Sequence, residues 1–132
     1  MIEHVIDHTP ESLKAQLTVR EFSPFVRNGR VGAWVALEYM AQAIAAFAGL
    51  NARARGEAPK VGFLIGSRHF SCTVAYLPVG TTLEISVVRQ LEDDGGLGLF
   101  DGTMTGPGIS ANATLSVFQP KSVDQFMLHR RA

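Results

Sequence analysis

The run from Gly32 to Leu50 constrains the fold most, because it predicts a helix that is apolar on every face and yet carries one carboxylate, Glu38. A helix of this kind belongs inside a core or a membrane. An ionisable group there destabilises the fold unless a partner pairs with it or a reaction uses it. Gln42 lies one turn further along on the same face. The run therefore predicts a core helix that also holds a site, with Glu38 and Gln42 lining one side of a pocket.

Three other interpretations of this run compete with that site. A membrane span needs about 20 predominantly apolar residues, and although the run nearly supplies them, Glu38 and Gln42 fall in its first half and no second span follows. The run also begins too far from the N-terminus for a secretory signal. A purely structural Glu38, which caps the helix or pairs within the core, stays open, because buried ion pairs also perturb carboxylates.

Composition indicates one compact domain with no strong electrostatic field around it. The chain has 132 residues, of which 46% are hydrophobic, and this suits a single core. Its 12 Lys and Arg balance 12 Asp and Glu, so no global charge attracts nucleic acid or an anionic membrane. Cys72 is the sole cysteine, which excludes an internal disulfide and is compatible with a reducing compartment. We therefore expect a cytoplasmic protein without nucleic-acid partners.

The remaining pattern predicts strands around the helix. Apolar and polar residues alternate with a period of two over residues 12–20 and 82–88. Residues 61–76 form a long extended run. Residues 93–96 are expected to form a hairpin turn that leads into a strand at residues 97–104. A last alternating run covers residues 111–117. This order predicts an α+β domain over residues 1–120, with the helix against one sheet face, and a tail over residues 121–132. Neither metal-ligand spacing nor a phosphate loop is present, so no metal or cofactor is expected.

The order of these elements resembles the hotdog-fold β-hydroxyacyl-acyl-carrier-protein dehydratases, and in particular the dehydratase-like proteins of the aryl polyene pathway. The resemblance rests on the helix motif Leu-Glu-Tyr-Met-Ala-Gln at residues 37–42, the strand at residues 63–70 and the turn at residues 76–80. It implies a hotdog fold, in which an antiparallel sheet wraps one long central helix. It also implies a dimer, either of identical chains or with a homologous subunit.

The resemblance further implies a reaction on a 3-hydroxyacyl thioester, delivered by an acyl carrier protein or by coenzyme A. A helix carboxylate and a histidine would remove the C2 proton and protonate the departing 3-hydroxyl group. Glu38 matches the carboxylate, and the Ala33 amide, after Gly32, matches the group that binds the thioester carbonyl. Trp34, Met40 and Phe63 are then expected to line or support an apolar tunnel that ends near Glu38.

The sequence departs from this family at the catalytic histidine. In the dehydratases a His-Phe-Pro segment precedes the helix, whereas here Ser23 and Pro24 fall at that place, and no histidine occurs between His8 and His69. His69 is the leading replacement, and strand alternation predicts that it faces away from Arg68. The alternative is that His69 has only a structural role. The start of the chain resembles the middle of the family's first segment. A segment that carries another histidine is therefore expected upstream of it.

Two alternative functions follow from the missing histidine. Hotdog thioesterases use a helix carboxylate on the same acyl-thioester scaffold and need no histidine in that loop. A non-catalytic hotdog subunit, in which Glu38 is structural and the chain supports an active relative, is the other alternative.

Overall fold

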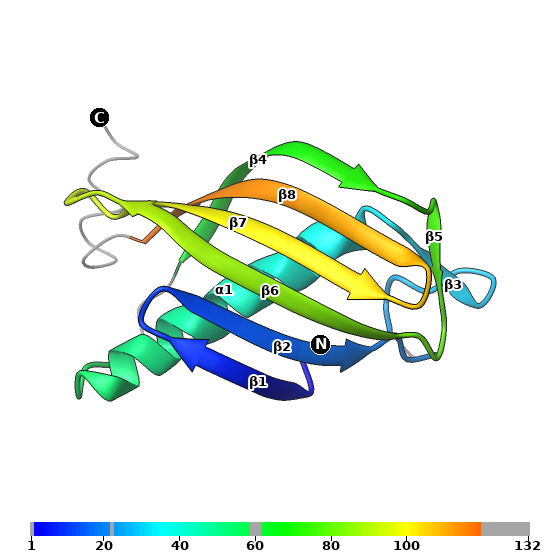
Figure 1. Cartoon of the computed structure of the whole chain (residues 1–132), viewed down its shortest axis with the longest axis horizontal. Coiled ribbons are helices and arrows are strands. Elements are labelled where there is room, and N and C mark those ends of the chain that lie inside the picture. Colours follow the sequence, from blue (N-terminus) through cyan, green and yellow to red (C-terminus); the bar gives the residue numbers. More distant parts are fainter. Residues whose placement is uncertain (1, 22, 59–61, 120–132) are drawn as a thin grey trace.

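The computed structural model describes residues 2–21, 23–58 and 62–119 of the chain. Within them one long helix and eight strands follow one another along the sequence (Figure 1). These elements are β1 (His4–Thr9), β2 (Ser12–Thr18), β3 (Arg30–Gly32), α1 (Val35–Ala54), β4 (Phe63–Cys72), β5 (Tyr76–Pro78), β6 (Thr82–Glu92), β7 (Leu97–Gly106) and β8 (Ile109–Phe118). The predicted tail at residues 121–132 lies outside the described residues.

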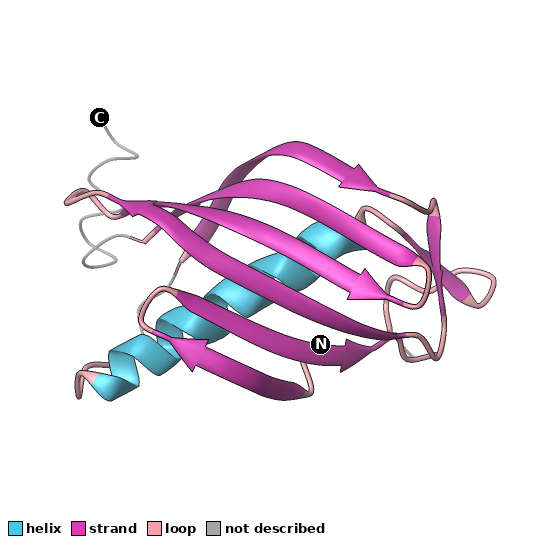
Figure 2. Ribbon diagram, in the orientation of Figure 1, coloured by secondary structure: helices cyan, strands magenta, loops and turns pink. Residues whose placement is uncertain are grey.

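Six of the strands form one antiparallel sheet in the order β1-β2-β6-β7-β8-β4, and the sheet curls around one side of α1 (Figure 2). The other two strands, β3 and β5, form a small separate ribbon beside the start of α1. The edges of the large sheet are β1 and β4. The predicted α+β arrangement, with one central helix wrapped by an antiparallel sheet, is therefore confirmed.

The core lies between α1 and the concave face of the sheet. Alternate residues of β2 face alternate residues of β6 across the ladder: Leu13 pairs with Val87, and Leu17 with Leu83. All four are buried, and burial of each such side chain contributes about 1.5–3 kcal/mol. The sheet-facing side of α1 supplies the other half of the core, through Val35, Ala36, Tyr39, Met40, Ala43, Ile44 and Phe47.

Gly102 allows α1 to approach β7 closely. A Cβ atom at this position would lie 2.7 Å from the Met40 sulfur and 3.0 Å from a Leu115 methyl group. Real Cβ atoms do not approach neighbours at the shorter of these distances, so the absence of a side chain at Gly102 sets the spacing between helix and sheet.

The element boundaries differ from the predicted ones in three respects. The helix begins at Val35 and extends to Ala54, because Gly32 is paired with Tyr76 in the β3–β5 ribbon and because Asn51 and Ala52 are buried. The strand predicted at residues 82–88 continues to Glu92. The short strands β1, β3 and β5 were not predicted, since β1 is exposed along most of its length and the other two have three residues each. Among the described residues, no helix is long and apolar enough to cross a membrane.

Candidate functional site

Glu38 lies in the first turn of α1 and is exposed to solvent. The expectation of a carboxylate within the core is therefore wrong for the single chain. The physical reason is that the sheet covers only one side of α1, and the opposite side carries small or polar residues, among them Ala41, Gln42 and Ala45. Glu38 makes no hydrogen bond or ion pair with any described residue. The carboxylate is thus available to a substrate or to a second polypeptide. Gln42, one turn further along, is partly buried, and neither residue borders the cavity described below, so their predicted role in lining a pocket stays a prediction.

The entrance to α1 differs from the expected carbonyl-binding arrangement. The Ala33 N–H already donates to the Ala75 carbonyl oxygen at 2.9 Å, so the expectation that this amide binds substrate is wrong. The next two amides, of Trp34 and Val35, have no hydrogen-bond partner among the described residues. Unpaired N–H groups at a helix N-terminus attract negative charge. These two amides are therefore the unpaired backbone donors at the start of α1 among the described residues.

Trp34 is an exposed aromatic side chain beside this entrance. Its side chain packs over Gly32, where an added Cβ would lie 2.5 Å from the indole nitrogen. The indole ring also meets the Phe25 ring edge to face, with centroids 5.6 Å apart, and yet 58% of Trp34 remains exposed. Gly32 therefore acts by leaving room for Trp34, which borders the approach to the helix N-terminus.

His69 lies on the edge strand β4, at a local irregularity. Its φ is +55°, in the left-handed region that residues other than glycine seldom adopt, and the ladder to β8 shifts register between Arg68 and Ser71. The predicted alternation of Arg68 and His69 about a regular strand is wrong for this reason. His69 is exposed, and no hydrogen bond among the described residues joins it to Glu38. A single chain does not assemble the expected carboxylate–histidine pair.

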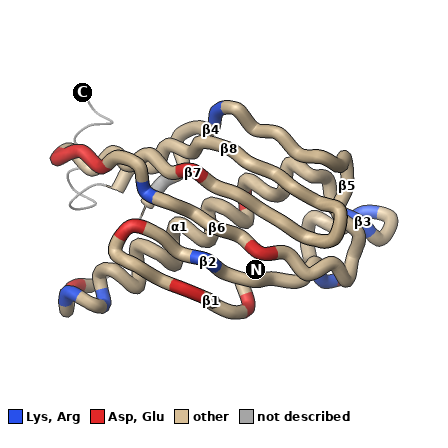
Figure 3. Tube along the Cα trace, in the orientation of Figure 1, with Lys and Arg blue, Asp and Glu red and all other residues tan. Residues whose placement is uncertain are grey.

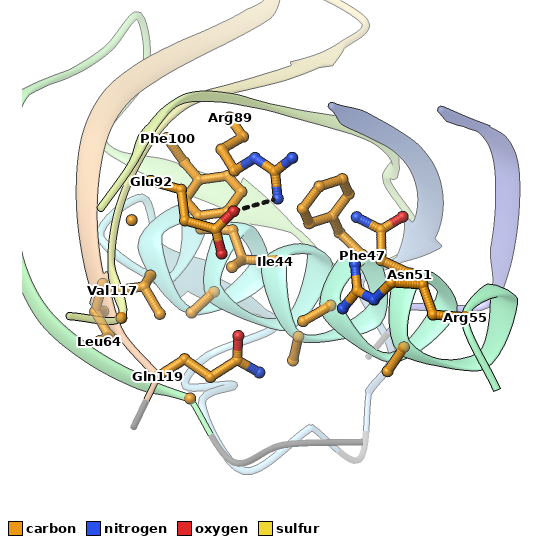
Figure 4. A pocket seen from close by; sticks show the side chains of 17 residues that line it. Ile44, Phe47, Asn51, Arg55, Leu64, Arg89, Glu92, Phe100, Val117 and Gln119 are labelled. Carbon is orange, nitrogen blue, oxygen red and sulfur yellow. Dashed lines mark ion pairs between the residues drawn. The ribbon is translucent and has the colours of Figure 1, made fainter. Parts of the chain in front are cut away.

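A cavity of about 160 Å³ lies beside the C-terminal half of α1 (Figure 4). Helix residues from Ala41 to Arg55 form one wall, and β4, β6, β7 and β8 form the others. The expected tunnel near Glu38 is wrong in its lining, since neither Trp34 nor Met40 borders this cavity: Trp34 is exposed and Met40 is fully buried against Gly102. The side chain of Phe63 lies outside the described part of the structure.

Two residues that the sequence did not single out, Asn51 and Arg89, are among the polar residues that line this cavity. The Asn51 Nδ2 and the Arg89 Nη2 both donate to the Pro10 carbonyl oxygen at 3.2 Å. The His8 Nε2 donates to the Asn51 Oδ1 at 2.8 Å, so His8, near the end of β1, ties this strand to α1. Asn51 continues the buried stripe of α1 four residues after Phe47, and a polar residue at that spacing is the signal that could have revealed it.

Acidic and basic residues are otherwise scattered along the described elements (Figure 3). Arg30, on β3, places its guanidinium 3.8 Å from the centroid of the exposed Tyr76 ring. Among the described residues, no group of three or more His, Cys, Asp or Glu side chains is arranged to hold a metal ion.

The family model for ApeP dehydratases matches residues 1–128 of the chain. The chain belongs to the ApeP-like dehydratase family. The resemblance to hotdog dehydratases of the aryl polyene type is thereby confirmed. A search of curated proteins found no match.

Solved structures agree with this family. The ApeP-like chain is similar to a chain of the dehydratase heterocomplex ApeI:P from Xenorhabdus doucetiae, with 28% identity and a TM-score of 0.90 over 99% of this chain and 89% of that one. It also resembles a hypothetical thioesterase with coenzyme A from Streptococcus pneumoniae, with 11% identity and a TM-score of 0.65 over 90% of each chain. A protein from Streptococcus mutans bound to acetyl CoA has 14% identity and a TM-score of 0.63 over 87% of this chain and 86% of that one. The last two likenesses support the hotdog fold alone.

Proposed function

We propose that this ApeP-like protein is a subunit of a dehydratase that acts on 3-hydroxyacyl thioesters in fatty acid or aryl polyene biosynthesis. The observation that carries the proposal is the position of Glu38, the carboxylate of the matched helix motif, on the side of α1 that its own sheet leaves open. An acyl carrier protein delivers the thioester, with coenzyme A as the alternative carrier.

The proposed reaction uses Glu38 for proton transfer. The C2–H bond and the C3–O bond of the substrate break, a C2=C3 double bond forms, and the C3 hydroxyl leaves as water after it receives a proton. Removal of the C2 proton places negative charge on the thioester carbonyl oxygen, which the Trp34 and Val35 amides can stabilise. A carboxylate within reach of the C2 proton or the leaving hydroxyl contributes about 10²–10⁴-fold to such a step.

A second subunit completes the proposed site across β4. This strand is an edge of the sheet, and it exposes Leu64 and Ile65, which are 44% and 58% exposed. Edges of this kind pair readily with another chain. The similar Xenorhabdus doucetiae structure is a heterocomplex, so a homologous subunit is the proposed partner, with a second copy of this chain as the alternative. The missing acid–base group then comes from that partner or from His69, whose strained backbone on the same edge suits a functional position.

The activity test compares water loss with thiol release. The full chain, alone and co-expressed with a homologous hotdog subunit, is incubated with a 3-hydroxyacyl thioester of the carrier protein, and the products are measured by mass spectrometry. Glu38→Gln should lower dehydration by about 10²-fold or more while the fold survives. The matched control is Glu57→Gln, an exposed carboxylate just beyond α1, which should leave activity unchanged.

Other results of this assay would support the alternative functions. Water-dependent thiol release without dehydration would identify a thioesterase. Full activity of Glu38→Gln in the complex would make the carboxylate structural and this chain a non-catalytic subunit. His69→Ala should lower activity only if His69 is the second acid–base group.

The assembly test compares substitutions on the two edge strands of the sheet, β4 and β1. Ile65→Lys on β4 should weaken association, as measured by sedimentation at micromolar concentration, because it places a charge on the proposed interface. Ile6→Lys on β1 is the matched control, since Ile6 is also exposed and also lies on an edge strand. Equal effects of the two substitutions, or a wild-type chain that stays monomeric with and without the homologous subunit, would contradict pairing through β4.

A further inference from the structure

The β3–β5 ribbon has one buried face and one exposed face. Val31 on β3 pairs with Leu77 on β5, and both side chains are buried in the core. Because side chains alternate along a strand, the residues on either side of these two point outward. Tyr76 is accordingly 49% exposed, and the Arg30 guanidinium lies over its ring. The outer face of the ribbon therefore presents an aromatic ring and a cation together.

Trp34 extends this outer face toward the start of α1. A Cβ atom at Gly32 would point to the outer face and would lie 2.5 Å from the Trp34 Nε1, so the indole ring covers that part of the ribbon. Although Phe25 meets the indole ring edge to face, Trp34 remains 58% exposed. Tryptophan and tyrosine combine an apolar ring with one polar group, and this makes them the aromatic residues that concentrate at the interface between a bilayer and water.

A tight hairpin projects from the beginning of β3 (Figure 1). Arg27 and Arg30 are joined by two backbone hydrogen bonds of 2.8 and 3.3 Å. Between them Asn28 and Gly29 have φ values of +56° and +73°, as the two central residues of a type I′ turn require. The Arg27 guanidinium also donates to two carbonyl oxygens of the preceding loop. The hairpin is therefore a well-defined tip with two exposed, uncharged residues and one arginine on each side.

The two arginines of this tip have no acidic partner. Among the described residues, neither Arg27 nor Arg30 forms an ion pair. The sequence contains no Asp or Glu in residues 22–37 or in residues 58–83, the stretches that include β3 and β5. The end of the molecule at β3 accordingly carries blue segments (Figure 3). Although the chain has no net charge, this end attracts anions locally.

This surface lies away from the cavity beside α1, which none of these residues borders. A protein ligand usually anchors an aromatic or arginine side chain in a pocket, whereas a bilayer conforms to side chains that project from a flat surface. We propose that the hairpin at residues 27–30, the outer face of the β3–β5 ribbon and Trp34 together dock the protein on a membrane that contains anionic lipids. The two rings lie at the level of the headgroups, and the two guanidinium groups contact lipid phosphates. The proposal does not rest on the proposed function.

The test uses Trp34 as its own reporter, because it is the sole tryptophan of the chain. The full chain is mixed with vesicles of phosphatidylcholine and phosphatidylglycerol in equal parts. The indole emission should shift to shorter wavelengths, and brominated lipids should quench it, since the ring moves from water into the headgroup layer. Salt should weaken this binding, and vesicles of phosphatidylcholine alone should bind far less protein. Unchanged emission with anionic vesicles, or equal binding to both kinds of vesicle, would overturn the proposal.

Cosedimentation with the same vesicles measures the contribution of each side chain. Arg30→Ala should lower the partition coefficient about five-fold, the factor that one basic residue contributes near an anionic surface, and the double variant with Arg27→Ala about 25-fold. Arg30→Gln, which keeps a long polar side chain without the charge, should behave as Arg30→Ala does. The matched control is Arg53→Ala, an exposed arginine near the other end of α1, which should change partition less than about two-fold. Equal effects of Arg30→Ala and Arg53→Ala would contradict the assignment.

Two further measurements separate membrane docking from other uses of this surface. The complex with the homologous subunit should bind anionic vesicles as the free chain does; binding lost in the complex would show that the partner covers the surface. The carrier protein without an acyl group is titrated in the absence of lipid, and binding to it that depends on Arg27 and Arg30, with none to vesicles, would assign the surface to an acidic protein. Either result would overturn the proposal. Arg30→Ala should leave dehydration in solution unchanged, so the docking surface and the proposed catalytic site are tested separately.

Discussion

Replacement of Asn51 by alanine should destabilise the protein by a predictable amount. The change removes two hydrogen bonds, one with the His8 ring and one with the Pro10 carbonyl oxygen, and each contributes about 0.5–1.5 kcal/mol. The Pro10 oxygen keeps its bond from Arg89, and His8 is only half buried, so neither partner is left fully unsatisfied. Alanine also has a higher helix propensity than asparagine, by about 0.5 kcal/mol. The net loss should be about 1.5 kcal/mol.

This value is measured by chemical denaturation of wild type, Asn51→Ala, His8→Ala and the double variant. For a chain of this length the loss corresponds to a midpoint about 6 °C lower on heating. The double-mutant cycle should give a coupling of about 1 kcal/mol between His8 and Asn51. Arg53→Ala, an exposed change in the same part of α1, is the control and should stay within about 0.5 kcal/mol of wild type. A coupling near zero, or a loss for Asn51→Ala no larger than the control's, would refute the reasoning.

Two glycines and a tyrosine give further tests of the packing. Gly102→Ala should destabilise by about 1–3 kcal/mol in urea denaturation, because the added Cβ meets the Met40 sulfur at 2.7 Å; Gly49→Ala on α1, with nothing within 4 Å, should instead stabilise by about 0.5–1 kcal/mol. Burial raises the pKa of Tyr39 above its usual 10.0, so the unfolding free energy should fall as the pH rises above about 10. Tyr39→Phe should remove that part of the alkaline loss, and an unchanged profile would show that the Tyr39 hydroxyl does not contribute to it.

The core of the fold was predictable because its signals are local and periodic. Leu13, Leu17, Ile85 and Val87 alternate along their strands, and all are buried where alternation placed them. The turn at residues 93–96 is present as expected, with the Asp93 carboxylate accepting from the Leu97 amide at 2.9 Å. Gly32 was assigned to the helix instead of to β3, since the pairing partner of β3 lies more than forty residues further along the chain.

The site was predictable only in part, because its geometry depends on how the helix packs against the sheet. Glu38 is the one charged residue of the apolar run from Gly32 to Leu50, which made it a candidate, but its exposure depends on the sheet covering a single side of α1. Alternation could not place His69, because a bulge breaks the period of two at that residue. Arg89 gave no signal at all, since its contacts with Pro10 and Phe47 join segments far apart in the sequence.

The two edge strands of the sheet differ in how readily they promote aggregation of the free chain. The edge at β1 carries the charged or polar residues His4 and Asp7 beside its exposed Val5 and Ile6, and such residues discourage growth by strand addition. The edge at β4 begins at Phe63, exposes Leu64 and Ile65, and has no acidic or basic residue before Arg68. Aggregation of an uncovered chain should therefore start at β4. The supply of whatever covers this strand then limits how much of the protein can accumulate in soluble form.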